Sequence, residues 1–333
     1  MRLGIGISED LQVPVQQRLA VDVEAAGFRS LWTNEASGRD ALLLCQAWAA
    51  ATTDLEVGVG VVPLWTRTPA QLAMACATLQ ESTGGRFLLG LGVSHPATMG
   101  PWHGAEVVRP LTAAREALAI LAQAEAGEPT DVEGEVLSSR RFRLRVSPRP
   151  LPTRRYLAAM GPRMLALAGE AADGALLNWC GLQEVARARE RVRDAARGAG
   201  RDPDDVEVAA YVRVAVAEDR DAARVALARQ IAAYCALPAY AAHLERQGFG
   251  DAVARVAAAR GADGEELLEA VGDDALAGLG WAASPGDDPA AMLDGYRDAG
   301  LDLFVARVVT VGDDPVDSVH QVVRSLDAYT ATA

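Results

Sequence analysis

The chain has 333 residues, of which 50% are hydrophobic and 23% charged, and its formal net charge is −13. All of its basic residues are arginines, because the sequence contains no lysine. A nucleic-acid-binding protein would present a basic face, so this acidic balance argues against a nucleic-acid partner. No apolar run approaches the length of a membrane span, so we expect a soluble globular protein without membrane association.

The cysteines indicate the compartment. The four of them, Cys45, Cys76, Cys180 and Cys235, form no Cys-x-x-Cys pair, and three lie in apolar contexts. This pattern favours buried free thiols in a reducing environment. The N-terminus begins a strand at once and lacks the charged segment and long apolar run of a signal peptide. We therefore expect a cytoplasmic protein.

Strands and helices are expected to alternate along the chain. Val15, Leu19 and Val23 mark one face of the first helix, and Pro69 suits the first position of the third. The expected strands cover residues 3–7, 30–33, 55–62, 87–91, 156–159, 175–178, 206–217 and 303–309. The expected helices cover residues 15–26, 41–51, 69–80, 111–124, 163–172, 183–198, 289–299 and 315–329. Eight such units predict an α/β fold, a (β/α)8 TIM barrel.

Two segments interrupt the alternation. Within residues 131–146, Gly134 lies between charged residues and residues 141–146 alternate arginine with apolar side chains, which predicts a β-hairpin or an extended excursion. Residues 220–271 are almost wholly helical in pattern, so we interpret the chain as one barrel domain with a helical insertion at about 220–280, before strand eight. The segment 101–104 is expected to be a loop. The alternative fold, an open doubly wound sheet, would need a glycine phosphate loop after the first strand, and residues 7–10 do not supply one.

Polar residues after the expected strands are the candidates for chemistry, because α/β barrels place their sites at the carboxyl ends of their strands. Ser94 and His95 follow the apolar strand 87–91, and a histidine titrates near neutrality, which suits proton transfer. Asn34 and Glu35 follow the second strand, where a carboxylate could accept a proton or orient a cofactor. The alternatives are a hydrogen-bonded structural histidine and, for the second pair, a helix cap or a salt bridge to Arg39.

Other strand ends suggest a bound cofactor. Gly161, Pro162 and Arg163 precede a helix, whose free N–H groups and nearby guanidinium would suit a phosphate, unless this is an ordinary proline-started helix. The glycines within residues 58–63 permit a close approach to a flat ring, or merely to neighbouring strands. Four tryptophans at or near strand ends could wall such a ring, or could be core residues: Trp32, Trp65, Trp102 and Trp179.

Two classes of site are not expected. The chain has no His-x-x-x-His motif and no His/Cys pair at ligand spacing, so we predict no metal site. No Gly-x-Ser-x-Gly elbow is present, which argues against an acyl hydrolase.

The combination of these motifs in this order resembles the bacterial luciferase-like superfamily, in particular its branch of F420-dependent oxidoreductases. The matching segments are residues 25–35, 62–63 with 67–69, 82–95, 161–165 and 171–174. The resemblance implies a TIM barrel with a long insertion, usually a homodimer, and a flavin or deazaflavin over the barrel mouth. F420 is the expected cofactor, and FMN is the alternative.

The resemblance also assigns cofactor-binding residues. In similar proteins a bulge with a non-proline cis peptide at the end of the third strand supports the ring system, and by position it maps onto Val59, Gly60 and Val61. The phosphate end of the cofactor would lie at Ala159, Met160, Gly161 and Pro162, with Arg163 close by. Asn34 and Ser94 complete the expected set.

The chain departs from the family pattern at one position. Many F420-dependent relatives carry an acidic residue followed by histidine after the second strand, whereas this chain has Glu35 followed by Ala36. His95 lies where some relatives place an acidic proton donor after the fourth strand. Our hypothesis is that His95 takes over the proton step, with Glu35 as the other candidate.

The expected reaction is hydride transfer between reduced F420 and a C=C or C=N bond of a small organic substrate. Because F420 has an anionic tail and the protein is acidic, local arginines must compensate. The candidates are Arg67, Arg154, Arg155, Arg163 and Arg307. Two alternatives remain open at this point: an FMN-dependent monooxygenase using reduced flavin and O2, and a non-catalytic flavin-binding protein.

Overall fold

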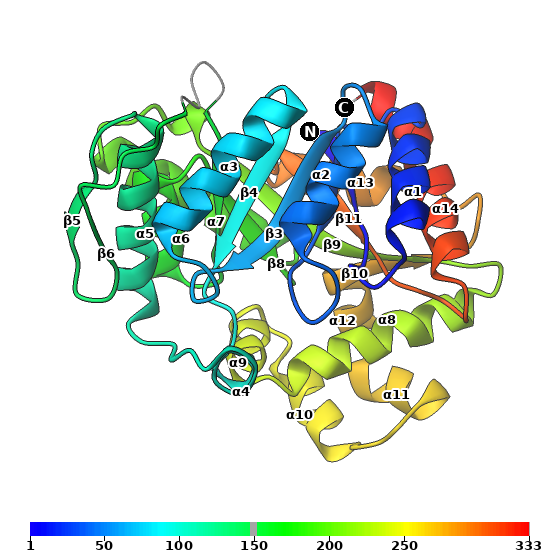
Figure 1. Cartoon of the computed structure of the whole chain (residues 1–333). Helices are drawn as coiled ribbons and strands as arrows, with labels where there is room; N and C mark the ends of the chain where they lie inside the picture. Colours follow the sequence, from blue (N-terminus) through cyan, green and yellow to red (C-terminus); the bar gives the residue numbers. More distant parts are fainter. Residues whose placement is uncertain (147–151, 333) are drawn as a thin grey trace.

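Eight parallel strands close into a barrel at the centre of the molecule (Figure 1). The computed structural model describes residues 1–146 and 152–332. In order around the barrel the strands are β1 (Arg2–Gly6), β2 (Ser30–Thr33), β3 (Glu56–Pro63), β4 (Phe87–Gly92), β7 (Arg154–Ala158), β8 (Gly174–Asn178), β9 (Glu207–Val216) and β11 (Leu303–Val308). Because β11 pairs back with β1, the (β/α)8 prediction is confirmed and the open doubly wound sheet is excluded.

One helix packs outside the barrel after each of these strands. The eight helices are α1 (Val13–Ala25), α2 (Ala41–Ala51), α3 (Pro69–Thr83), α5 (Pro110–Glu125), α6 (Pro162–Ala171), α7 (Leu182–Gly198), α13 (Ala290–Asp298) and α14 (Pro315–Leu326). Their ends follow local chemistry: in α3 the Thr68 side chain caps the start, and Gly84 ends the helix at φ 64°. Short 3-10 turns occur at Pro203–Asp205 and Asp327–Thr332.

Two further elements lie between β4 and β7. The strands β5 (Asp131–Glu133) and β6 (Ser138–Arg140) form an antiparallel hairpin, which confirms the excursion predicted there. The expectation of a loop at residues 101–104 was wrong, because α4 (Pro96–His103) runs to His103 and ends at Gly104. The His95 side chain and Pro96 together start this helix, and Pro101 lies inside it.

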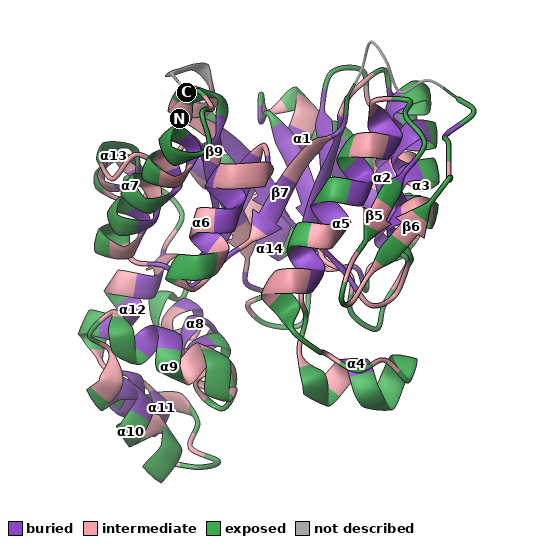
Figure 2. Cartoon of the chain, turned by 90° about the vertical axis from the view of Figure 1, so that its left-hand side faces the viewer, coloured by how far each residue is buried: buried purple, intermediate pink, exposed green. Residues whose placement is uncertain are grey.

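The insertion is a cluster of five helices: α8 (Arg220–Cys235), α9 (Pro238–Arg246), α10 (Gly250–Ala258), α11 (Gly264–Val271) and α12 (Asp273–Leu279). A short strand that the sequence did not predict, β10 (Gly280–Ala283), follows and pairs with the second half of β9. There it takes the edge of β9 that β8 pairs with earlier. Figure 2 shows the insertion and α4 on opposite sides of the same end of the barrel.

The middle of the barrel is filled by large side chains. Trp32 is fully buried there, with its ring edge-on to Tyr156 at 5.7 Å and to Tyr211 at 6.3 Å between centroids. Leu176 and Val305 belong to the same cluster. Trp32 is therefore a core residue, which is the alternative that the sequence left open for it.

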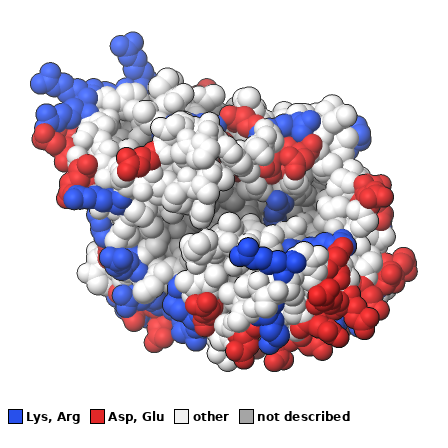
Figure 3. All heavy atoms as spheres, turned by 90° about the horizontal axis from the view of Figure 1, so that it is seen from below, with Lys and Arg blue, Asp and Glu red and all other residues white. Residues whose placement is uncertain are grey.

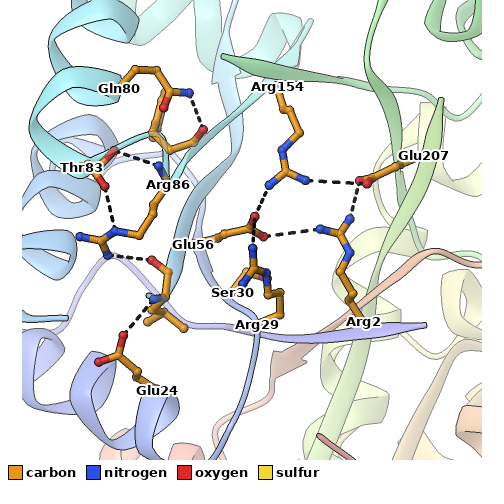
Figure 4. A network of polar contacts seen from close by, with 12 residues as sticks. Arg2, Glu24, Arg29, Ser30, Glu56, Gln80, Thr83, Arg86, Arg154 and Glu207 are labelled. Atoms are coloured by element: carbon orange, nitrogen blue, oxygen red, sulfur yellow. Dashed lines mark hydrogen bonds and ion pairs between the residues drawn. The ribbon is translucent and has the colours of Figure 1, made fainter. Parts of the chain in front are cut away.

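A network of ion pairs closes the end of the barrel at which the strands begin (Figure 4). The buried carboxylate of Glu56 pairs with Arg2, Arg29 and Arg154, and Glu207 pairs with Arg2 and Arg154. The expectation that Arg154 serves a cofactor tail was therefore wrong, because Glu56 and Glu207 hold it at the opposite end.

Arg155 is also engaged elsewhere. Its side chain pairs with Asp173 at 3.2 Å and with the buried Glu125 of α5 at 3.7 Å. It thus ties β7 to α5, and the expectation that it binds a cofactor tail was wrong as well.

All four cysteines are free thiols. Cys45, Cys76 and Cys180 are buried, as predicted, and Cys235 is half-buried. Across residues 1–146 and 152–332, no helix combines the length and the apolar character needed to cross a bilayer.

Candidate active site

The end of the barrel at which the strands finish is the candidate site. Figure 3, seen from that end, shows the molecule hollowed, with a basic side chain inside the hollow. The insertion and α4 border this end from opposite sides (Figure 2). We refer to it as the mouth.

The inward-facing layer at the mouth is polar, unlike the apolar layer beneath it. Successive residues of a strand alternate between faces, so Arg213 lies one layer above Tyr211, and Arg307 one layer above Val305. Each arginine is bonded to an asparagine at the end of another strand. Asn34 accepts a hydrogen bond from Nη2 of Arg307 at 2.7 Å, and Asn178 accepts one from Nη1 of Arg213.

Aromatic rings enclose Arg213. Only 5% of the residue is exposed, and its guanidinium carbon lies 4.0 Å from the ring centroid of Trp179 and 5.3 Å from that of Tyr234. The amide of Asn178 in turn donates a hydrogen bond to the Tyr240 hydroxyl at 2.9 Å. Burial lowers the pKa of Arg213 to about 10, so the side chain remains a cation at neutral pH.

The end of β3 carries the bulge that the resemblance implied. The Gly60–Val61 peptide is cis, and the pairing with β4 shifts register between Val59 and Val62. Glycine is required here, because a Cβ on Gly60 would lie 2.4 Å from the Tyr211 hydroxyl. On the neighbouring strand, a Cβ on Gly92 would lie 2.3 Å from Cγ2 of Val61. The glycines thus let Tyr211 and Val61 pack against the backbone at the end of these strands, and Gly60 and Val61 themselves are partly exposed.

The N-terminus of α6 opens onto free space. Gly161 is its N-cap and Pro162 its first residue, and no side chain among the described residues caps it. A Cβ on Gly161 would meet nothing within 4 Å. Arg163 is exposed beside it, and Arg246 of the insertion bonds the Met160 carbonyl at 3.2 Å. Exposed helix N–H groups next to guanidinium groups suit a phosphate.

Glu35 is held by a salt bridge, although not by the one with Arg39 that the sequence offered as an alternative. Its Oε1 accepts from Arg67 at 2.5 Å, and Arg67 also pairs with Asp40 at 2.7 Å. Arg39 instead donates to the carbonyls of Glu9 and Asp10. The other oxygen of Glu35, Oε2, is buried without a partner among the described residues. A ligand N–H or O–H group would satisfy it.

His95 is the N-cap of α4. Its Nδ1 accepts a hydrogen bond from the Ala97 backbone N–H at 3.2 Å. In the neutral ring the proton therefore lies on Nε2, for which the described part of the chain offers no acceptor. Ser94 beside it has φ 54°, and its hydroxyl lies 3.5 Å from that of Thr98. The histidine thus has a structural role at one nitrogen and a free donor at the other.

The remaining tryptophans and Ala159 differ in where they lie relative to the mouth. Trp65 donates to the Val93 carbonyl at 2.7 Å, and Trp179 packs on Arg213, so both lie near the mouth. Trp102 is 54% exposed on α4. Ala159 is buried at the end of β7, ahead of the open helix start.

The sequence reasoning missed Arg213, Tyr234 and Tyr240. A signal for Arg213 was present, because it is the one charged residue between Glu207 and Val216, at an alternate position from Tyr211. A charge on the inward face of an otherwise apolar strand is costly, which points to function. The two tyrosines gave no such signal, since only the fold brings α8 and α9 to the mouth.

A separate cavity lies outside this site. A cavity of about 600 Å³ opens beside the barrel, lined by residues that include Leu182, Gln247, Trp281 and Tyr296, and it contains none of the inward-facing side chains of the mouth. Among residues 1–146 and 152–332, no three His, Cys, Asp or Glu side chains gather so as to hold a metal ion.

Comparison with known proteins places this geometry in context. A family model described as luciferase-like monooxygenase matches residues 8–325. The chain is 32% identical over 289 residues to the 5,10-methylenetetrahydromethanopterin reductase of Methanolobus tindarius, covering 85% of this chain and 86% of that one. It is also 32% identical over 250 residues, 70% of this chain and 72% of the relative, to a Mycobacterium tuberculosis protein with the provisional name coenzyme F420-dependent oxidoreductase.

A solved structure shares the fold. The coenzyme F420-dependent tetrahydromethanopterin reductase from Methanopyrus kandleri superposes with a TM-score of 0.79 over 98% of both chains, at 23% sequence identity. At this identity the likeness concerns the barrel and its insertion as a whole.

Proposed function

The chain belongs to the luciferase-like monooxygenase family and is an oxidoreductase, and we propose that it uses coenzyme F420 to reduce a small organic substrate. The observation that carries the choice of F420 is the 32% identity, over 70% of the chain, with the M. tuberculosis relative named for that coenzyme. When bound, the deazaflavin supplies hydride chemistry, here toward a C=C or C=N bond.

The residues at the mouth fit such a cofactor. Val59, Gly60 and Val61 would hold the ring system, at the bulge that ends β3, where Gly60 and Val61 are partly exposed. The start of α6 at Gly161 would take the phosphate, with Arg163 beside it. The unpartnered Oε2 of Glu35 would accept a hydrogen bond from the bound ligand.

His95 is assigned the proton step. Because Nδ1 lies against the Ala97 N–H, Nε2 is the nitrogen left for the substrate; the imidazolium form of the ring would pass its Nε2 proton to the substrate atom adjacent to the one reduced, which leaves a neutral imidazole. Glu35 is the poorer candidate, because Arg67 already holds its Oε1 in a salt bridge. Asn34, bonded to Arg307, and Ser94, next to His95, would line the pocket between them.

The first experiment is a side-by-side titration of the purified protein with F420 and with FMN. Saturable F420 binding at micromolar concentration or below, with weaker FMN binding, is expected. Preference for FMN, or binding of neither, would contradict the proposal.

Gly161 offers a sharper test of the phosphate site. Its backbone is extended (φ −121°) and its surroundings are open, so a side chain fits there. Gly161→Asp supplies a good helix N-cap, which should keep α6 intact or stabilise it, while its charge repels a phosphate. We expect F420 binding to weaken about 10-fold, since like charge costs on the order of 1.4 kcal/mol at this range. Gly161→Ser, an uncharged cap, is the matched control and should change binding little.

The family description favours one alternative, an FMN-dependent monooxygenase that takes reduced flavin and O2. Such an enzyme would consume oxygen when supplied with reduced FMN and a substrate. Oxygen consumption well above that of free reduced FMN would support this alternative over the F420 reductase.

We also propose that the chain forms a single barrel domain that works in the cytoplasm as a homodimer. Leu43 on α2 and Met74 on α3 are 70% and 54% exposed on adjacent helices, which a second copy would cover. Light scattering after gel filtration should give twice the chain mass, and Leu43→Glu with Met74→Glu should give the monomer. A wild-type monomer would contradict the dimer.

A further inference from the structure

Arg213 and Arg307 are register partners on adjacent strands. In the parallel pairing of β9 with β11, Arg213 lies beside Arg307, at the last layer before the mouth. Like charges beside each other on neighbouring strands repel, and the field of Arg307 adds to burial in lowering the pKa of Arg213. Two buried or half-buried cations have thus been placed side by side.

No carboxylate within the described ranges offsets these charges. Arg213 donates hydrogen bonds to Asn178 and to the Tyr211 carbonyl, and Arg307 donates one to Asn34. Nη1 of Arg307 is buried without a partner among the residues that the structure describes. Glu9 and Glu35 follow the ends of β1 and β2, and neither forms an ion pair with Arg213 or Arg307 within the described ranges; Glu35 pairs with Arg67. This is notable in a chain with 45 acidic residues.

The neighbours of Arg213 orient it without neutralising it. Its guanidinium stacks on Trp179, while Asn178 holds one Nη1–H and is itself bonded by Tyr240. Rings stabilise a cation through their faces and leave the guanidinium edge free for two parallel bonds to an oxyanion. Tyr234 and Tyr240 come from α8 and α9, so the insertion builds one wall of this subsite.

We propose that Arg213 and Arg307 form an anion subsite and that the substrate carries a carboxylate which they bind. The proposal rests on the proposed F420-dependent function, and it adds the class of substrate. In the order of strands, β9 lies across the barrel from β3, whereas the ring and phosphate of the cofactor would occupy the side of β3, β4 and β7. The two arginines therefore face the ligand from the side left for the substrate.

The test measures the binding of benzoate and of benzamide, which share a ring and size and differ in charge. Calorimetry on the purified full-length protein, with and without F420, should detect benzoate binding and little benzamide binding. Arg213→Gln should weaken benzoate binding about 10- to 100-fold, as expected for losing hydrogen bonds to a charged group. Arg213→Lys keeps the charge and should weaken binding less, and Arg307→Gln is the second independent variant.

The control and the contrary outcomes are defined by the same titrations. Arg324→Gln on the exposed face of α14 removes one charge far from the mouth and should leave benzoate binding unchanged. Thermal unfolding of each variant checks that it is folded. Equal benzoate affinity in wild type and Arg213→Gln, or no binding by wild type at millimolar benzoate, would overturn the proposal.

F420 titrations of the same variants identify the source of the anion. Unchanged F420 affinity in Arg213→Gln supports a substrate carboxylate. A loss of F420 affinity in Arg213→Gln, with benzoate competing against F420, overturns it, since the anion would then be the cofactor's. If F420 fails to bind wild type while benzoate binding depends on Arg213, the subsite stands and the proposed cofactor fails.

Discussion

The two ends of the barrel use arginine in opposite ways. Where the strands begin, Arg2, Arg29 and Arg154 surround Glu56, and Glu207 completes the network (Figure 4). Where the strands finish, Arg213 and Arg307 have only amide and carbonyl partners within the described part of the chain. A charge matched by its opposite within the fold stabilises the fold, whereas a buried charge left without one is available to a ligand.

This contrast agrees with the general division of labour in such barrels, in which stability is concentrated at one end and chemistry at the other. Here the division is visible in the bonding of single side chains. We therefore expect substitutions where the strands begin to change mainly stability, and substitutions where the strands finish to change mainly binding.

The largest effect on stability is expected at Glu56. Glu56→Gln keeps the shape of the side chain but removes the carboxylate that three arginines share: Arg2, Arg29 and Arg154. Of these, Arg29 has a side chain that is 52% exposed. Removing one partner of a buried ion pair costs about 3 kcal/mol. Urea unfolding should show this loss, with ligand binding by the folded variant unchanged. The control is Glu128→Gln, at an exposed position. A comparable loss of stability in this control would show that the effect of Glu56→Gln does not come from the ion-pair network.

A similar magnitude, in activity rather than stability, is expected at His95. Asn can replace it as N-cap of α4, accepting from Ala97, but cannot give up a proton. With the hydride acceptor that an F420 screen identifies, His95→Asn should lower kcat about 100-fold, the size typical of a lost general acid. Its thermal stability should match wild type. Unchanged turnover would rule out His95 as the proton donor.

A smaller, pH-dependent effect is expected at Glu24, at the closed end. Partial burial opposes its charge, but hydrogen bonds from the backbone N–H groups of Asp54, Leu55 and Thr53 outweigh it and hold the pKa of Glu24 below its usual 4.5. A carboxyl group whose pKa is lowered by folding stabilises the fold above the unfolded pKa of 4.5. This contribution is lost as the pH falls from that value through the pKa of the folded state.

Glu24→Gln should therefore cost about 1 kcal/mol at pH 7 and progressively less below pH 4.5. Urea unfolding of wild type and variant at pH 7 and at a pH below 4.5 measures how this loss of stability changes with pH. Exposed Glu81 supplies the matched variant Glu81→Gln, for which neither value should change. A penalty that stayed constant with pH would show that the charge of Glu24 is not what matters.

The smallest change in stability is expected where the charge is unmatched. Arg213→Met removes a buried cation and its repulsion with Arg307, but loses the stacking on Trp179 and the bond to Asn178. These terms oppose each other, so the free energy of unfolding should stay within about 1 kcal/mol of wild type. A loss as large as that of Glu56→Gln would make Arg213 a structural residue and would end the contrast between the two ends.

Most of the barrel could be predicted from the sequence, because each strand and helix carries its own period and its own start and stop residues. Pro69 marks one helix start, and Gly161 and Pro162 precede another, each within a few positions of where the structure has them. Two elements escaped. The helix α4 depends on a histidine cap, and β10 is a four-residue strand that pairs with the second half of β9.

The candidate site divides in the same way. The sequence by itself determined which residues end the strands, so it found Asn34, Glu35, Gly60, His95 and Gly161, since position along a strand is a local property. Only the tertiary structure decided which charges are neutralised. Arg154 meets Glu56 across 98 positions and Arg307 meets Asn34 across 273, and the sequence treated both arginines alike. Closing the barrel decides such partners, because pairing depends on distance in space and on burial rather than on neighbours along the chain.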